Sequence, residues 1–176
     1  MSDKAKNLEE NKGETLQAND LPVTVHAQYV RDISFENPNA PESLRAGLSG
    51  PEMDVNVSMD ARELEDDEIK NMYEVALTIS ATAKREDKTF FVAEVIYGVT
   101  VSIGEVVPEN QYHPVLFIEI PRLAFPFARQ IMATITSQGG YPPVLLNPVD
   151  FQALYMERFK DEIATAQKAS AEGTIN

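Results

Sequence analysis

The chain has 176 residues, of which 43 % are hydrophobic, enough for the core of one domain of ordinary size. Its 28 Asp and Glu outnumber 15 Lys and Arg, and the net charge of −13 repels phosphate backbones and anionic lipids, so nucleic acids and membrane surfaces are disfavoured as partners. The absence of cysteine excludes disulfides, thiolate nucleophiles and cysteine-based zinc sites.

The two ends of the sequence are too polar to build a core. Residues 1–20 hold two large apolar residues, Leu8 and Leu16, so we expect an acidic, disordered tail. Residues 164–176 have a similar composition and predict a flexible C-terminal tail, which leaves one domain over residues 21–163. Because the N-terminal segment lacks the apolar centre of a signal peptide, and no apolar run reaches the roughly 18 residues of a membrane span, we expect a cytoplasmic protein without stable membrane insertion.

Three segments alternate apolar and polar side chains, along residues 23–35, 53–60 and 73–83. Such alternation is typical of half-buried strands in an antiparallel sheet that has one wet face. Val30 and Arg31 alone break the alternation of the first segment. The sequence therefore predicts three strands of this kind.

A fourth segment, residues 89–103, is apolar on both faces except at Glu94. We expect it to be a strand that is central in the sheet or covered by another subunit. The polar residues 84–88 before it predict a hairpin connection, and residues 63–71 form a longer acidic link between the second and third strands.

The pattern changes after Ile103, where residues 108–122 are rich in proline and predict a loop with a short apolar centre. From about Ala124, apolar residues recur every fourth position and predict a helix that ends at the pair Gly139–Gly140. The recurring residues are Leu123, Phe127, Ile131 and Ile135, with Ala124, Ala128 and Met132 beside them.

A second helix is predicted with Asn147 as N-cap, Pro148 at the first helical position and Asp150 near the positive end of the helix. Its apolar stripe consists of Phe151, Leu154, Tyr155, Met156 and Phe159. Because the strands precede the helices, the order predicts an α+β domain in which a four-stranded antiparallel sheet carries two C-terminal helices on one face.

No motif in the sequence predicts catalysis, a metal or a cofactor. The one glycine pair follows a helix, so there is no glycine-rich phosphate loop, and His26 and His113 lack metal-ligand spacing. The serines lack the setting of a nucleophile elbow, and the acidic pairs lie in polar links where no carboxyl is desolvated. We therefore expect a protein that is not an enzyme.

Acidic residues gather beside a proline-bracketed loop. The alternation places Asp32 and Glu36 on the face opposite Ile33 and Phe35, and Glu94 stands alone among apolar residues. If the three carboxylates share the outer face, they form a patch for Lys or Arg side chains of a partner. Solubility alone would also explain them, so both interpretations stay open.

The residues after this loop include several large apolar side chains. Leu44 and Leu48 lie in a segment with Gly and Pro, and Met53, Val55 and Val57 follow on one face of a strand. Methionine and loop-borne apolar side chains repack readily, which favours binding to varied partners. A place in the core is the alternative for these residues.

Several blocks of the sequence resemble the SecB family of bacterial protein-export chaperones. The blocks are YVRDISFENPNAP, YEVALTISATA, FFVAEV and AFPFARQIMATITSQGGYPPVLLNPVDFQALYMERF. The resemblance runs in unbroken order from about residue 22 to residue 160. It implies a four-stranded antiparallel sheet with two helices, assembled as a homotetramer that is a dimer of dimers.

The resemblance also implies a function without catalysis, nucleotide or metal. SecB-like proteins hold unfolded secretory precursors in the cytoplasm and deliver them to the SecA ATPase. Matching positions imply that SecA docks on Asp32, Glu36, Val92 and Glu94. They imply client binding by Leu44, Leu48, Met53, Val55 and Val57. The alternative is a SecB-like protein dedicated to one partner, such as an antitoxin.

Overall fold

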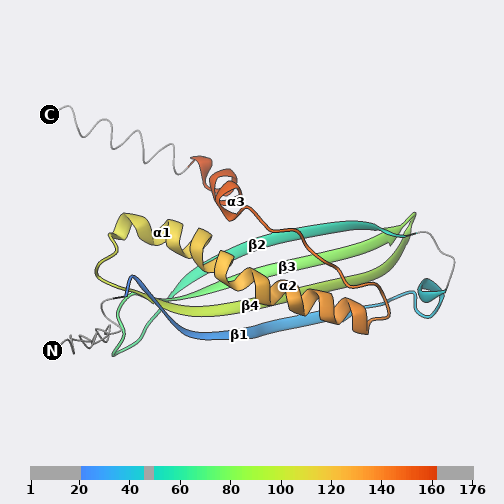
Figure 1. Cartoon of the computed structure of the whole chain (residues 1–176), viewed down its shortest axis with the longest axis horizontal. Coiled ribbons are helices and arrows are strands. Elements are labelled where there is room, and N and C mark those ends of the chain that lie inside the picture. The colour runs from blue at the N-terminus through green and yellow to red at the C-terminus, as the bar shows by residue number, and fades with distance from the viewer. Residues whose placement is uncertain (1–20, 46–49, 162–176) are drawn as a thin grey trace, which may run out of the picture.

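Four strands form one antiparallel sheet in the computed structural model, which describes residues 21–45 and 50–161 (Figure 1). The strands are β1 (Val23–Glu36), β2 (Glu52–Leu64), β3 (Met72–Arg85) and β4 (Lys88–Ile103), and their order across the sheet is β1-β4-β3-β2. The predicted sheet is confirmed, and so is the central place of β4. The expected tails, residues 1–20 and 164–176, lie outside the described residues.

The helical elements after the sheet lie over one of its faces (Figure 1). They are η3 (Glu109–Gln111), α1 (Tyr112–Pro114), η4 (Val115–Glu119), α2 (Ile120–Gln138) and α3 (Phe151–Arg158); a short turn, η2 (Glu42–Leu44), follows β1. The α+β class with helices on one face is thereby confirmed. In the part of the chain that the structure describes, no helix is long and apolar enough to cross a membrane.

The core lies between the sheet and α2. Odd-numbered side chains of β3 and β4 point toward the helix layer and are buried, among them Leu77, Ile79 and Val95, each 0 % exposed. On α2 the buried stripe includes two small residues, Ala124 and Ala128, which let the helix lie close to the sheet. The large residues that recur at every fourth position lie beside this stripe, which also includes Phe125 and Met132.

Leu123 and Phe127 are the least buried of the recurring residues. They are 41 and 45 % exposed, whereas the neighbouring Met132 is fully buried. Ile131 and Ile135 are half-buried. The recurrence of apolar residues at every fourth position thus predicted the helix correctly, but the residues that recur are not the most deeply buried ones.

The predicted loop over residues 108–122 is wrong, because helical structure begins at Glu109 and continues into α2. Pro121 lies in the first turn of α2, where a missing N–H is tolerated, and the wider π turn η4 directly precedes it. The end of the helix agrees with the prediction. Gly140 has φ of +90°, a left-handed conformation that glycine adopts without strain.

α3 begins later than predicted. Its N-cap is Asp150, whose side chain accepts a hydrogen bond from the backbone N–H of Ala153 at 2.9 Å. Asn147 and Pro148, the expected cap and first helical residue, precede the helix. Asp and Asn cap helices about equally well, so local sequence did not decide between them. Met156 was expected in the apolar stripe and is 49 % exposed.

β1 changes register against β4 twice, between Val25 and Ala27 and again between Val30 and Asp32. Each irregularity adds one residue to β1 and reverses which side chains face the helices. Val30, opposite the buried Tyr97, therefore points toward the helix side, which explains why it breaks the alternation. The simple odd–even pattern predicted for β1 is wrong between the two bulges.

A buried carboxylate ties three strands together on the sheet face that the helices leave open. Glu74 in β3 is 3 % exposed and accepts hydrogen bonds from the Tyr29 hydroxyl in β1 and from Arg62 Nε in β2. The Arg31 guanidinium lies 3.7 Å from the same carboxylate. The Tyr29 ring covers Gly98 of β4, where a Cβ would come within 2.6 Å of the ring. We call Tyr29, Glu74 and Arg62 the polar brace.

The partners in the polar brace keep Glu74 ionised. The hydrogen bond from Tyr29 lowers the pKa of Glu74, and Arg62 and Arg31 act in the same direction against the effect of burial. Burial and the bond to Glu74 raise the pKa of Tyr29, which therefore remains a hydrogen-bond donor. The brace thus holds a charged, fully bonded carboxylate within the sheet.

We expect Glu74→Gln to lower the free energy of unfolding at pH 7 by about 2 kcal/mol, because hydrogen bonds to a charged group are lost. The pKa of Glu74 is lower in the folded state, so its stabilisation is complete above the unfolded-state pKa and is lost as pH falls through the folded-state pKa. Urea unfolding from neutral to acid pH should show the difference between the two proteins shrinking. Glu63→Gln, at an exposed position, is the control; a difference for Glu74→Gln that is independent of pH would contradict the role of the charge.

Candidate functional site

The open face of the sheet carries carboxylates at one end. Ser34 lies opposite Glu94, and Glu36 lies opposite Val92, across the β1–β4 pair. Directly opposed residues share a face, and Asp32, two residues before Ser34, is on that face as well. The structure therefore brings together the four residues that the sequence assigned to docking. We call Asp32, Glu36, Val92 and Glu94 the acidic patch.

The carboxylates of the acidic patch are available to a partner. Asp32 and Glu36 are exposed, and Glu94 is half-buried. Within residues 21–45 and 50–161, none of the three takes part in an ion pair. Strands are spaced about 4.8 Å apart, so the sheet holds these like charges close together on a flat surface. Such a surface attracts a cationic partner and disfavours an anionic one.

The end of β1 that carries Asp32 and Glu36 also packs against the helix side through its other face. Phe35 stacks on Phe91, with ring centroids 5.6 Å apart, and its ring fills the space at Gly139, where a Cβ would lie 2.1 Å away. Ile33 also points to the helix side, opposite Val95, as predicted. It nevertheless stays 44 % exposed, because α2 does not extend over this edge.

Apolar side chains are also exposed near the opposite edge of the sheet. Met53 and Val55 are 42 and 38 % exposed, Val57 is half-buried, and their pairing with odd-numbered residues of β3 places all three on the helix side of β2. Leu44 in η2 is 42 % exposed. Leu48 lies outside the described residues. Met53, Val55 and Leu44 are thus not core residues of the protomer.

Beside Val57 a hollow of about 500 Å³ opens between β2 and α3. Arg158 on α3 forms part of its wall, where it donates to the backbone carbonyl of Met59 and its guanidinium carbon lies 5.0 Å from the centroid of the Phe159 ring. The bond to Met59 joins α3 to β2. The sequence did not single out Arg158, because its backbone partner is 99 residues away along the chain.

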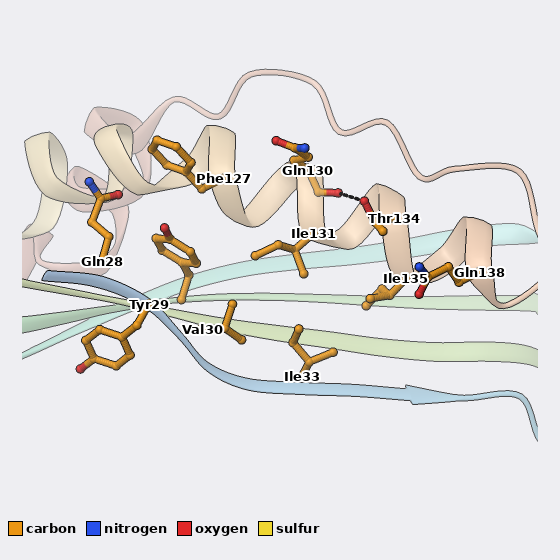
Figure 2. A pocket seen from close by; sticks show the side chains of 11 residues that line it. Gln28, Tyr29, Val30, Ile33, Phe127, Gln130, Ile131, Thr134, Ile135 and Gln138 are labelled. Carbon is orange, nitrogen blue, oxygen red and sulfur yellow. Dashed lines mark hydrogen bonds between the residues drawn. The ribbon is translucent and has the colours of Figure 1, made fainter.

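A second hollow, of about 600 Å³, lies between β1 and α2 (Figure 2). Val30 and Ile33 reach it from β1, and Phe127 and Ile131 reach it from α2. Val30, Ile33 and Phe127 are each 44 or 45 % exposed. Sequence reasoning missed this β1–α2 hollow, although two signals pointed to it: the break at Val30 and the stripe of large residues on the helix.

Comparison with known sequences points to one family. The family model described as preprotein translocase subunit SecB matches residues 16–162. The protein-export protein SecB of Rhodospirillum centenum is 46 % identical over 151 residues, which cover 86 % of this chain and 88 % of that protein. The protein of the same name from Caulobacter vibrioides is 42 % identical over 160 residues, covering 91 and 90 %.

A solved structure agrees with this in fold. It is a SecB-like chaperone of Mycobacterium tuberculosis in complex with a ChAD peptide from the HigA1 antitoxin, and it matches with a TM-score of 0.56. The likeness covers 73 % of this chain and 88 % of that one at 10 % sequence identity. At that identity the likeness concerns the fold alone.

Proposed function

The chain belongs to the SecB family and is a protein-export chaperone, and on this premise we propose that it holds unfolded precursor proteins in the cytoplasm and delivers them to the SecA ATPase. SecB is a family of chaperones, not of enzymes. The observation that carries the proposal is the separation of two surfaces: an acidic patch on the open face of the sheet and exposed apolar side chains on the helix side.

SecA docks on the acidic patch in this proposal. The carboxylates of Asp32, Glu36 and Glu94 attract basic side chains of SecA, and the half-buried Val92, opposite Glu36, supplies an apolar contact at the end of the patch. Complementary charge speeds the encounter with SecA and selects it as the partner. The small apolar area of the patch limits the affinity, so that the complex can dissociate.

Clients bind on the helix side in this proposal, on Leu44, Met53, Val55 and Val57, and on Leu48, which lies outside the described residues. Support comes from the exposure of Leu44, Met53 and Val55, because exposed apolar clusters mark interaction sites. These side chains offer no polar groups that would require one particular sequence in the client. Capture of varied unfolded segments needs that lack of discrimination.

The protein acts as a homotetramer, a dimer of dimers. The β1–α2 hollow supports this, since its apolar lining would be covered by a second copy of the chain. Several copies raise avidity for a long client although each contact is weak. The net charge of −13 keeps such an assembly soluble.

A chaperone dedicated to one antitoxin is not favoured. The relatives at 42 and 46 % identity are named protein-export proteins, whereas the structure with an antitoxin peptide is 10 % identical.

We expect reversal of Asp32, Glu36 and Glu94 to Lys to weaken SecA binding at least tenfold, because attraction becomes repulsion. Isothermal calorimetry measures the affinity. The control reverses Asp67, Glu105 and Glu109, which are exposed, change the net charge equally and lie toward the other end of the sheet. Unchanged SecA affinity of the patch variant, or equal loss in the control, would refute the docking assignment.

For the client surface, the double variant Met53→Ser and Val55→Ser should bind unfolded polypeptides about tenfold more weakly, since apolar area is lost from the contact. Fluorescence anisotropy with several unrelated, permanently unfolded polypeptides measures the change. Val106→Ser is the control, at a residue 63 % exposed elsewhere on the surface. Normal affinity of the double variant would exclude this edge of the sheet as a client site.

Native mass spectrometry should give four times the chain mass of 19.6 kDa. Ile33→Asp together with Phe127→Glu should shift the assembly toward smaller species, because two charges would enter an apolar contact. Leu145→Glu, at a residue 69 % exposed, serves as the control. A wild-type protein that is monomeric at micromolar concentration would overturn the assembly.

A further inference from the structure

The docking strand and the client segment are joined by a short connector, residues 37–43. Glu36 of the acidic patch directly precedes it, and Leu44 directly follows it. Backbone bonds fold the connector on itself: Ser43 N donates to Asn39 O at 2.9 Å, and Leu44 N donates to Pro41 O at 3.1 Å. The position of Leu44 therefore depends on where this connector is anchored.

One side chain outside the connector anchors it. The Tyr141 hydroxyl lies 2.8 Å from Asn37 Oδ1, 2.8 Å from Ser43 Oγ and 3.0 Å from the backbone carbonyl of Phe90. Asn37 and Ser43 are the two ends of the connector, and Phe90 belongs to β4. A single hydroxyl thus contacts both ends of the connector and β4. The Asn39 amide, in the middle of the connector, also donates to β4, to the carbonyl of Thr89 at 2.8 Å.

The hydrogen-bond count makes this arrangement specific. The Tyr141 and Ser43 hydroxyls have one proton each, while Asn37 Oδ1 and the Phe90 carbonyl only accept. When the Tyr141 hydroxyl donates to one of these two acceptors, the Ser43 hydroxyl can donate its own proton either to the Tyr141 oxygen or to Asn37 Oδ1. The distance from Ser43 Oγ to Asn37 Oδ1 is 3.2 Å. Ser43 is 8 % exposed, so removal of the Tyr141 hydroxyl takes a partner from a buried group.

Tyr141 is itself held in place at the end of α2. Its ring centroid lies 4.9 Å from that of Phe91, and its backbone N–H donates to the carbonyl of Thr136 at 3.2 Å. Thr136 is 0 % exposed. Two residues before Tyr141, the Phe35 ring occupies the space that a side chain at Gly139 would need. A Cβ at Gly140 would come 3.1 Å from Leu44 Cδ2. Tyr141 is therefore held by contacts with β4 and the end of α2 that do not involve the connector.

We infer that Tyr141 is a positioning residue for client capture: its hydroxyl fixes the connector so that Leu44 is presented at a set place beside Gly140. This rests on the proposed client role of Leu44. Without the hydroxyl, ordering the connector becomes part of the cost of binding a client. The acidic patch is fixed separately by the β1–β4 pairing, so SecA docking does not depend on Tyr141.

The test is a double-mutant cycle on the full-length protein, with reduced, carboxymethylated lactalbumin as the unfolded probe. Tyr141→Phe should weaken probe binding about three- to tenfold, and Leu44→Ser should weaken it as well. In the Leu44→Ser background, Tyr141→Phe should cause no further loss, because both changes act through the same side chain. Affinity for SecA and the native mass should be unchanged.

Two further measurements separate positioning from a general loss of stability. Hydrogen exchange at the amides of Ser43 and Leu44 should accelerate in Tyr141→Phe. Tyr112→Phe removes a hydroxyl that accepts a bond from Asn71 Nδ2 at 3.0 Å, far from the connector, and should leave probe binding and this exchange unchanged.

The outcomes are distinct. If Leu44→Ser weakens probe binding and Tyr141→Phe does not, or if their effects simply add, the positioning role is refuted while the proposed function stands. If Leu44→Ser binds the probe like the wild type, the client role of Leu44 fails, and the positioning role fails with it.

Discussion

The packing of one helix against one face of the sheet is the contact on which the rest of the structure depends. Ala124 and Ala128 bring α2 close to the fully buried side chains of β3 and β4. Because the described helices lie on one side, they leave the opposite face uncovered. The alternation of the strands makes most of that face polar, although β4 contributes Val92 and Ile96 to it. Two chemically different surfaces follow from this one packing arrangement, and the proposed function assigns a different partner to each.

The width of the helix explains where apolar surface remains exposed. A helix about 10 Å across covers roughly two strands spaced 4.8 Å apart, so the central strands are buried and the edge strands are not. On β1 this leaves Val30 and Ile33 beside the hollow along α2, and on β2 it leaves Met53 and Val55. The proposed assembly surface and client surface are the two uncovered edges of the same layer.

The open face needs its own stabilisation, since no helix covers it. The polar brace supplies it by bonding a buried, ionised Glu74 to Tyr29 and Arg62 on the two edge strands. The acidic patch lies toward the other end of this face, where its carboxylates have no such partners in the described part of the chain. Carboxylates on one face thus serve stability where they are bonded and remain available for recognition where they are not.

The sequence by itself determined the strands, their wet and apolar faces over most of their length, the end of α2 at its glycine pair and the family. These features depend on alternation, on backbone freedom at single residues and on runs of matching residues, all of which are local. The tertiary structure decided the rest: the helical course of residues 108–122, the buried stripe of α2, the bulges of β1 and the pairing of β1 with β4 that brings the residues of the acidic patch together. It also decided the polar brace and the contacts of Tyr141. Tyr29 and Glu74 are 45 residues apart in the chain, and Tyr141 and Asn37 are 104 residues apart. No local pattern specifies which groups meet over such separations.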